Sequence, residues 1–120
     1  MMNVLLVEDD LLSQKITRRF LVNCGMNVTI ANDGAEALSL IREKHFSLIL
    51  MDLQMPTMDG CEAARRIRAL DDPHFKTVPI LAFTSSLELR EKAAAFGMND
   101  FLNKPLNSEE LRAKINQYLA

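Results

Sequence analysis

The sequence predicts an α/β fold, a (βα)5 three-layer sandwich in which helices cover both faces of a five-stranded parallel sheet. Two observations carry this prediction. Short apolar runs alternate along the chain with longer stretches of helical periodicity, and the connections between them are short. The length of 120 residues is also typical of one domain, so we expect residues 1–120 to form a single unit.

Five short runs rich in β-branched and other apolar residues are the expected strands. The first, third and fourth are continuously apolar, as central strands covered on both faces should be. The second alternates between apolar and polar residues, which is typical of an edge strand. The runs are Asn3–Val7, Asn27–Ala31, Ser47–Met51, Val78–Phe83 and Asp100–Asn103.

Between these runs lie five expected helices, each with an apolar stripe or an alanine-rich composition. We expect most of each stripe to pack against the sheet. The stripes are Leu12, Ile16, Phe20 and Leu21 in the first helix, Ala37, Leu38 and Ile41 in the second, Ala63, Ile67 and Leu70 in the third, and Leu111, Ile115 and Leu119 in the fifth, while the fourth helix is the segment from Leu87 to Phe96.

Helix boundaries are marked by residues with capping preferences. Four expected N-caps carry a glutamate three residues later, which is the capping-box spacing. Asp10 directly precedes the first helix and is its expected cap. Gly25 and Gly97 stand where helices should end. The four caps and their glutamates are Asp33 with Glu36, Asp59 with Glu62, Ser85 with Glu88, and Asn107 with Glu110.

Composition and charge exclude several classes of function. The net charge is −2, with acidic and basic residues mixed, so there is no basic face for nucleic acid or for a membrane surface. Cys24 and Cys61 are isolated, which favours a reducing, cytoplasmic location. His45 and His74 have no partners at metal-ligand spacing. Nucleotide-binding glycine motifs and the G-x-S-x-G motif are absent from the sequence.

Chemically useful side chains follow four of the expected strands. The first strand is followed by Glu8, Asp9 and Asp10, the third by Asp52, the fourth by Thr84 and the fifth by Lys104. Ligands in parallel α/β sheets bind outside the carboxyl ends of the strands, so we expect these side chains to converge at one edge.

The acids need a compensating positive charge, because clustered carboxylates raise the pKa of one another. An acidic pair after a strand is more often a helix cap than a metal site. Here Asp10 is the better cap candidate, which leaves Glu8 and Asp9 free. Asp52 follows four apolar residues and needs a partner if it is partly buried. Mg²⁺, usually held by one or two carboxylates with water and phosphate, fits this set of ligands.

At these residues the chain resembles the receiver domains of response regulators in two-component and phosphorelay systems. The resemblance covers essentially all 120 residues. Within that family the chain is similar to chemotaxis regulators. From Asn3 to Pro56, especially at Glu8-Asp9 and Gln14-Lys15, it most resembles the receivers of hybrid histidine kinases, with a stand-alone regulator as the alternative. The matching motifs are Val4–Asp10, Leu50–Pro56, Met58–Gly60, Pro79–Thr84 and Phe101–Pro105.

The resemblance implies a flavodoxin-like doubly wound topology and a phosphoacceptor switch that catalyses only its own phosphorylation and dephosphorylation. The implied phosphodonor is a histidine kinase or a histidine phosphotransfer protein, and the implied output is a changed surface for a protein effector, formed by the fourth helix, fifth strand and fifth helix. The implied roles are Asp52 as phosphoacceptor, Glu8, Asp9, Asp52 and the Gln54 carbonyl as the Mg²⁺ site, Thr84 and Lys104 as phosphoryl contacts, Thr84 and Phe101 as switch residues, and Pro105 after a cis peptide bond.

The chain departs from the family pattern at several positions. Glu8 stands where many members have aspartate, Phe101 where tyrosine is common, and Ser85 where alanine is frequent. Gln54 and Ser86 occupy positions that tune dephosphorylation in the family. Neither is acidic, so the sequence does not predict fast self-hydrolysis.

Three other functions compete with the receiver interpretation. A small aspartyl-phosphate phosphatase would need an acid two residues after the nucleophile, where this chain has Gln54. A flavin-binding module would need a hydroxyl- and glycine-rich phosphate loop in place of Glu8-Asp9-Asp10. A phosphorylation-independent binding module would not need the complete set of acids, hydroxyl and lysine. The first expected helix, with Leu11, Leu12, Ile16 and Phe20, is a candidate docking element for the phosphodonor, of which we expect only the edge to be available.

Overall fold

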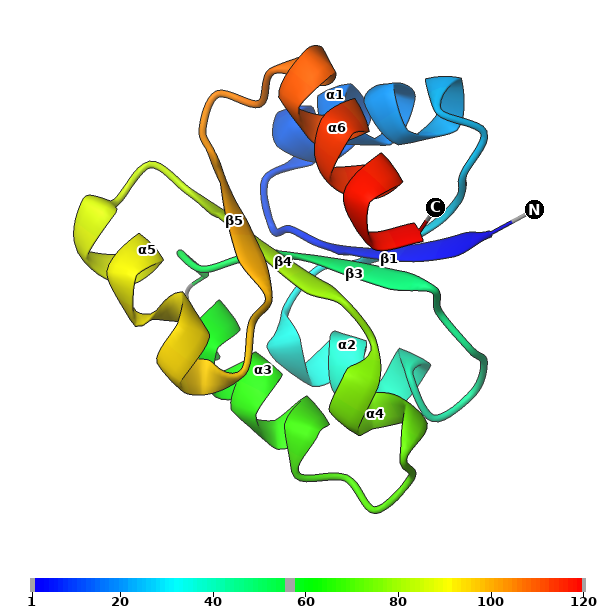
Figure 1. Cartoon of the computed structure of the whole chain (residues 1–120), viewed down its shortest axis with the longest axis vertical. Coiled ribbons are helices and arrows are strands. Elements are labelled where there is room, and N and C mark those ends of the chain that lie inside the picture. Colours follow the sequence, from blue (N-terminus) through cyan, green and yellow to red (C-terminus); the bar gives the residue numbers. More distant parts are fainter. Residues whose placement is uncertain (1, 56–57, 120) are drawn as a thin grey trace.

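The computed structural model describes residues 2–55 and 58–119. In these residues a single sheet of five parallel strands has the order β2-β1-β3-β4-β5, which confirms the predicted fold class (Figure 1). The strand β2 lies at one edge, as its alternating sequence predicted. The strands are β1 (Asn3–Val7), β2 (Asn27–Ala31), β3 (Leu48–Asp52), β4 (Ile80–Thr84) and β5 (Asp100–Asn103).

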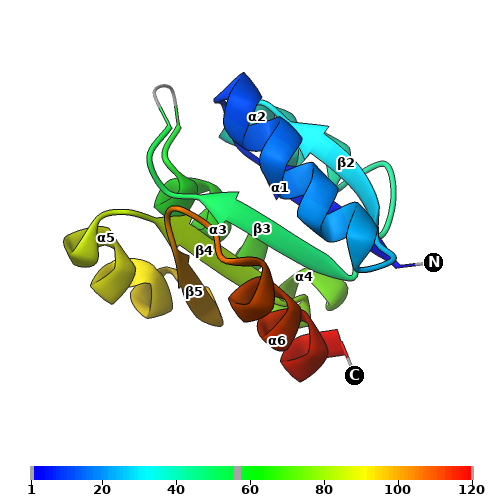
Figure 2. The ribbon, with the colours of Figure 1, turned by 90° about the horizontal axis from the view of Figure 1, so that it is seen from above.

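Helices cover both faces of the sheet. One layer holds α1 and α6, which lie nearest the viewer in Figure 2, and the remaining helices pack on the opposite face. The helices are α1 (Leu11–Asn23), α2 (Gly34–Leu40), α3 (Gly60–Arg68), α4 (His74–Thr77), α5 (Leu87–Lys92), the 3₁₀ helix η1 (Ala93–Phe96) and α6 (Ser108–Leu119).

The sheet divides the hydrophobic core into two clusters. Alternate residues of a strand point to opposite faces, so Leu5 and Val7 pack toward α2 and α3, whereas Val4 and Leu6 pack toward α1 and α6. All four side chains are fully buried. The central strands are therefore rigid supports for whatever stands at their carboxyl ends.

Two of the central strands extend further toward their carboxyl ends than the sequence predicted. The strand β3 ends at Asp52 and β4 ends at Thr84, so both residues belong to the sheet and do not merely follow it. In the strand register Asp52 pairs with Phe83, and Thr84 pairs with Asn103. Backbone pairing with neighbouring strands fixes the direction of these two polar side chains.

Most predicted helix caps are confirmed, and one is wrong. The Asp10, Asp33 and Asp59 side chains each accept a backbone hydrogen bond from the first turn of their helix, as Asn107 does for α6. The fourth expected helix is capped by Ser86 and not by Ser85, because β4 extends to Thr84 and moves the helix start by one residue. That helix also divides into α5 and η1 before it ends at Gly97, whose φ is +88°.

The expected burial of the α1 stripe is wrong for Leu12 and Ile16, whereas Leu21 is buried and Phe20 packs against the core as expected. Leu12 is 66% exposed and Ile16 is 48% exposed, whereas Gln14, Thr17 and Leu21 are buried. The Gln14 amide explains this rotation of the helix, since it donates to the Glu8 carbonyl oxygen at 2.6 Å and anchors that side of α1 against β1. An apolar strip of α1 is consequently left at the surface.

The short helix α4 was not predicted, since its four residues are too few to show a helical period. His74 at its start stacks on His45, with ring centroids 4.3 Å apart, and its Nε2 atom is 3.0 Å from the Phe46 carbonyl oxygen. Both histidines precede strands. They therefore lie at the opposite edge of the sheet from the acids.

Arg68 connects three segments of the chain beside the sheet. Its guanidinium donates to the Gly97 carbonyl at 2.8 Å, to the Phe75 carbonyl at 3.0 Å and to Asn99 Oδ1 at 2.9 Å. Hydrogen bonds from a charged donor are among the stronger ones in proteins. We expect Arg68→Ala to lower the free energy of unfolding, measured with urea, by about 2–3 kcal/mol.

The matched control for Arg68 is Arg65 on the same helix. Arg65 pairs with Glu62, and its side chain is 57% exposed. An exposed ion pair contributes little, so Arg65→Ala should cost less than about 1 kcal/mol. Equal losses in the two variants would show that the three bonds of Arg68 contribute nothing beyond helix propensity.

Candidate functional site

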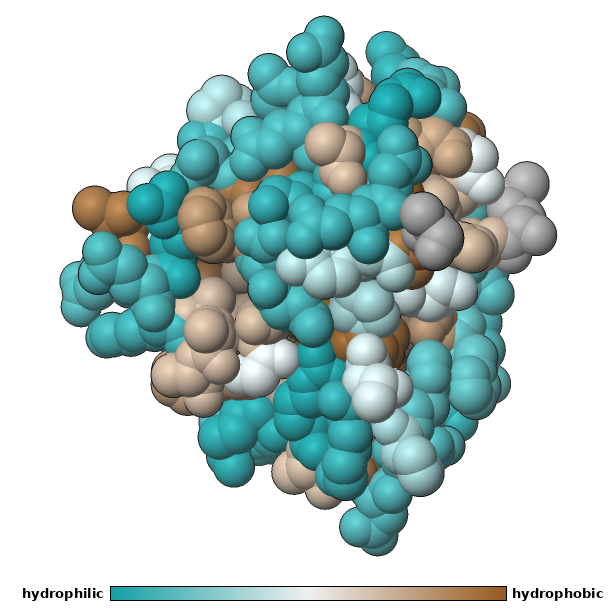
Figure 3. All heavy atoms as spheres, viewed as in Figure 1, coloured by the Kyte–Doolittle hydropathy of each residue, from teal (hydrophilic) through white to brown (hydrophobic). Residues whose placement is uncertain are grey.

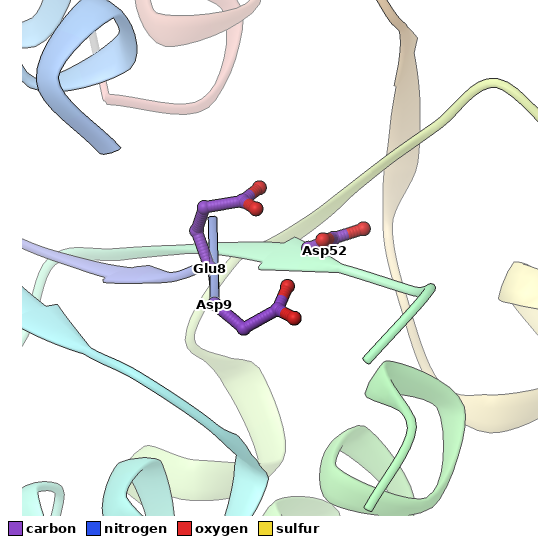
Figure 4. Close-up of side chains that lie close together, drawn as sticks. All are labelled: Glu8, Asp9 and Asp52. Carbon is purple, nitrogen blue, oxygen red and sulfur yellow. The ribbon is translucent and has the colours of Figure 1, made fainter. Parts of the chain in front are cut away.

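Three acids meet at the carboxyl ends of β1 and β3. Glu8 and Asp52 are buried, with exposures of 0% and 1%, whereas Asp9 is exposed. One carboxylate oxygen from each lies within 4.8 Å of the others, and Figure 4 shows the three side chains converging on one space. The expected convergence of acids at this edge is thus confirmed.

Backbone contacts fix the orientation of two of these acids. One oxygen of Glu8 accepts a hydrogen bond from the Asp10 backbone N–H at 3.0 Å. Asp52 Oδ1 accepts one from the Gln54 backbone N–H, also at 3.0 Å. The Gln14 amide, whose role the sequence did not reveal, ties the Glu8 carbonyl to α1. Each buried acid therefore keeps an oxygen directed toward the shared space.

Lys104 brings one positive charge into the acid cluster. Its Nζ atom is 3.1 Å from Asp52 Oδ2 and 3.4 Å from Glu8 Oε2. The lysine backbone N–H donates to the Thr84 carbonyl at 3.2 Å, and the Lys104–Pro105 peptide bond is cis, as the resemblance implied. One ammonium faces three carboxylates, so the cluster retains an excess of negative charge.

The buried position of Glu8 makes its carboxyl a weaker acid than an exposed glutamate. Burial, with a smaller contribution from the charge of Asp52, raises the pKa of the Glu8 carboxyl to about 7. The Asp10 backbone hydrogen bond and the Lys104 ammonium lower this pKa but do not outweigh burial. A hard divalent cation bound by oxygen ligands would offset the free-energy cost of keeping these buried carboxylates charged. The residues of the cluster are of the type that holds Mg²⁺.

The raised pKa of Glu8 predicts a pH dependence of stability in metal-free buffer. The folded protein holds this proton more tightly than the unfolded chain, whose glutamate has the model value of 4.5. The stabilisation that the protonated Glu8 gives the folded state is fully present below pH 4.5 and is lost as pH rises through about 7. The free energy of unfolding falls by no more than about 3 kcal/mol over this range.

The measurement for Glu8 is urea unfolding between pH 5 and pH 8 in the presence of a chelator. We expect the stability of the wild type to fall relative to that of Glu8→Gln as pH rises, with no further change well above pH 7. A difference between the two proteins that stays flat or grows with pH would contradict the assignment.

Thr84 lies beside the acids, but its hydroxyl has another partner. The side chain is 1% exposed, and Oγ1 donates to the side-chain oxygen of Gln54 at 3.1 Å. The same hydroxyl accepts from the Ser86 backbone N–H at 3.0 Å, and Ser85 Oγ donates to Gln54 Oε1 at 3.3 Å. The sequence indicated that the Gln54 side chain lies at a position that tunes dephosphorylation, but it did not predict these hydrogen bonds with Thr84 and Ser85.

Phe101 lies on β5 away from the acid cluster. Its half-buried ring sits beneath the Arg90 guanidinium, with 4.4 Å from the guanidinium carbon to the ring centroid. Arg90 also donates to Asn103 Oδ1 at 3.2 Å. The structure thus brings Glu8, Asp9, Asp52 and Lys104 together, with Thr84 and Gln54 alongside and Phe101 apart. Pro56, which ends the second sequence motif, lies outside the described residues.

The fold and the site together define a class of protein: a doubly wound α/β domain of strand order 2-1-3-4-5, with a cluster of acids and a lysine beside β1 and β3, where the strand order reverses. The model of the response regulator receiver domain matches residues 4–116. The chain belongs to this family, whose members are signalling switches of two-component and phosphorelay systems.

Individual relatives agree with the family assignment. The chain is 39% identical over 119 residues to the transcription factor SKN7 of Candida albicans, and the match covers 98% of this chain but 21% of that protein. The chain thus spans about a fifth of the length of that relative. It also resembles the receiver domain of the sensor histidine kinase PA1611 of Pseudomonas aeruginosa, which has a magnesium ion coordinated in its active site cleft.

The PA1611 receiver superposes with a TM-score of 0.90 at 34% identity, covering 98% of this chain and 96% of that one. A third relative is the receiver domain of the Saccharomyces cerevisiae response regulator Ssk1, solved with the histidine phosphotransfer protein Ypd1. It has a TM-score of 0.85 and 35% identity, and the match covers 98% of this chain and 88% of that one.

Among residues 2–55 and 58–119, no helix has the length and hydropathy needed to cross a membrane.

Proposed function

We propose that Asp52 accepts a phosphoryl group from a phosphohistidine on a histidine kinase or a histidine phosphotransfer protein. The observation that supports this most is the pairing of the buried Asp52 carboxylate, with Oδ1 on the Gln54 N–H and Oδ2 on Lys104. A carboxylate held in one orientation in this way needs little reorganisation to act as the nucleophile.

In the proposed step an Asp52 carboxylate oxygen attacks the phosphorus and the P–N bond breaks, so that the imidazole leaves with the electron pair. Phosphoryl transfer has a loose transition state, and catalysis consists mainly of positioning and charge neutralisation. Lys104 neutralises part of the charge on the phosphoryl oxygens. Mg²⁺ bound by Glu8, Asp9, Asp52 and the Gln54 carbonyl would neutralise the rest.

Two comparisons support the proposed metal and donor. The PA1611 receiver holds magnesium in its active site cleft, and the acid cluster of this chain offers carboxylate oxygens of the kind that Mg²⁺ prefers. The Ssk1 receiver forms a complex with a histidine phosphotransfer protein. By this proposal the chain catalyses only its own phosphorylation and dephosphorylation, in the cytoplasm and without direct contact with nucleic acid or a membrane.

The exposed strip of α1 is the proposed docking surface for the phosphodonor. Leu12 and Ile16 line a shallow groove together with Phe20, and the basic residues Lys15 and Arg19 border it. The helix begins directly after Asp10, so a partner bound on α1 lies next to the acid cluster. An apolar helix surface with acidic neighbours is the complementary partner.

The proposed output is a changed surface over α5, β5 and α6. Thr84 would turn toward the phosphoryl group, and Phe101 would then move into the space that the threonine leaves. A population shift of this kind needs only that the phosphoryl group binds one arrangement better than the other. Figure 3 shows a largely hydrophilic surface with some apolar patches. Leu87 at the start of α5 is an exposed apolar residue of the proposed output surface, at 58%.

The test is intact-mass spectrometry after incubation with acetyl phosphate and Mg²⁺, beside an Asp52→Asn control. We expect one phosphoryl adduct that requires Mg²⁺ and is absent from the control. Sampling at short times prevents fast hydrolysis from hiding the adduct. If neither sample gains the adduct, the phosphoacceptor role is wrong and a phosphorylation-independent binding module becomes the better interpretation.

A further inference from the structure

The side chain of Gln54 joins two loops at the edge of the site. Its Oε1 atom accepts hydrogen bonds from the Thr84 hydroxyl at 3.1 Å and from the Ser85 hydroxyl at 3.3 Å. We call this pair of bonds the Gln54 bridge. It connects the segment after β3 with the segment after β4, and it gives the unusual residue Ser85 a partner.

The Gln54 bridge uses the proton of the proposed switch residue. The Thr84 hydroxyl has one proton, which it donates to Gln54, and its oxygen accepts the Ser86 backbone N–H. Asp52 has its own partners in the Gln54 N–H and Lys104. The Thr84 hydroxyl must therefore leave Gln54 before it can donate to a phosphoryl group on Asp52.

We propose that the Gln54 side chain is a positioning residue that holds Thr84 in the unphosphorylated arrangement and so sets how easily the domain switches. This inference rests on the proposed function. The bridge competes with the phosphoryl group for the same hydroxyl proton. The stronger the hydrogen bond from Thr84 to Gln54, the smaller the population of the arrangement in which Thr84 can contact a phosphoryl group.

The exposure of Gln54 and Ser85 indicates that the bridge affects conformation and does not contribute to core packing. Gln54 and Ser85 are exposed, and Gln54 is not part of either hydrophobic cluster, so neither side chain fills the core. The backbone groups of Gln54 are separate from the bridge. A change of its side chain leaves in place the N–H that binds Asp52 and the carbonyl proposed as a metal ligand.

The test measures the affinity for beryllium trifluoride, a phosphoryl mimic, with Mg²⁺ by isothermal titration calorimetry. Gln54→Met keeps the length of the side chain and removes the strong acceptor. We expect it to bind the mimic about fivefold more tightly than the wild type, as loss of one competing hydrogen bond of ordinary strength predicts. Ser85→Ala should give a smaller gain of about twofold, because its bond is longer and exposed.

Two further variants separate the bridge from a general effect on the loops. Ser85→Thr retains the hydroxyl and should restore the wild-type affinity. Ser85→Ala added to Gln54→Met should have no further effect, since the acceptor is already absent. Without any ligand, the Thr84 methyl resonance of Gln54→Met should move toward its position in the mimic-bound wild type, which a change in water access alone would not cause.

The outcomes distinguish the two proposals. If the wild type does not bind the mimic in the presence of Mg²⁺, the proposed function is wrong and the inference fails with it. If the wild type binds but Gln54→Met binds equally or more weakly, only the bridge is wrong. Independent effects of the Ser85 and Gln54 changes in the double variant would also overturn it.

Discussion

Lys104→Met is expected to lower the free energy of unfolding by about 3 kcal/mol at pH 8 in metal-free buffer. It removes the ammonium that lies 3.1 Å from Asp52 and 3.4 Å from Glu8, and leaves two buried carboxylates without a charged partner. Removal of one member of a buried ion pair costs about 3–5 kcal/mol, and the 25% exposure of Lys104 favours the lower end.

The same substitution should slow phosphorylation by acetyl phosphate about 100-fold, because a positioned charge that stabilises the transition state is lost. Added Mg²⁺ should recover part of the stability but not the rate, since the cation compensates the acids without replacing Lys104 at the phosphoryl oxygens. Urea unfolding with and without Mg²⁺ measures the first effect, and the rate of adduct formation by mass spectrometry measures the second.

Lys114→Met is the matched control for Lys104. The Lys114 side chain is also 25% exposed and lies 2.7 Å from Asp100 Oδ2. Asp100 keeps hydrogen bonds from the Tyr118 hydroxyl and from the Phe101 backbone N–H after the change. We expect a loss of about 1 kcal/mol and an unchanged rate of phosphorylation. Equal losses of stability in the two variants would mean that the acid cluster does not depend on Lys104.

Gly60→Ala is expected to destabilise the fold by about 3 kcal/mol and to disturb the site. A Cβ atom at Gly60 would lie 2.3 Å from the Asp52 carbonyl oxygen and 2.9 Å from the Leu53 Cα atom. Both are backbone atoms at the end of a central strand and cannot turn away as a flexible side chain could. The variant must therefore displace either the start of α3 or the end of β3, which carries Asp52.

Gly25→Ala provides the comparison for Gly60. Gly25 has a φ of +82°, but a Cβ atom there would have nothing within 4 Å. We expect a loss of about 1 kcal/mol, from left-handed backbone strain alone. Urea unfolding and adduct formation should show both defects in Gly60→Ala and a small stability loss alone in Gly25→Ala. If Gly60→Ala were the milder change, the close approach of α3 to β3 would be wrong.

Periodicity and capping residues were sufficient to predict the strands, their parallel sheet and most helix starts. Those signals depend on residues close together in the sequence, and so do the contacts that they predict. The Asp33 and Asp59 side chains, for example, each accept a hydrogen bond from the N–H group three residues away. The rotation of α1 was not predictable in this way. It depends on the Gln14 amide reaching the Glu8 carbonyl and Asn32, a contact that apolar spacing does not encode.

The acid cluster was predictable because parallel strands bring their carboxyl ends to one edge. Contacts between side chains of different loops were not. The Gln54 bridge joins residues 30 and 31 positions apart, and Arg90 reaches the ring of Phe101 from a separate helix. No spacing rule relates such pairs, because the distance between two loops is set by the assembled sheet.

The contact of Lys104 with Glu8 joins residues 96 positions apart in the sequence. During synthesis Glu8, Asp9 and Asp52 all leave the ribosome well before the lysine. A nascent chain that has not yet reached residue 104 carries the three carboxylates without their ammonium, and it also lacks α6, which covers one face of the sheet. The site is consequently completed only when residue 104 has been added, so a chain interrupted between residues 52 and 104 holds the acids but not the charge that balances them.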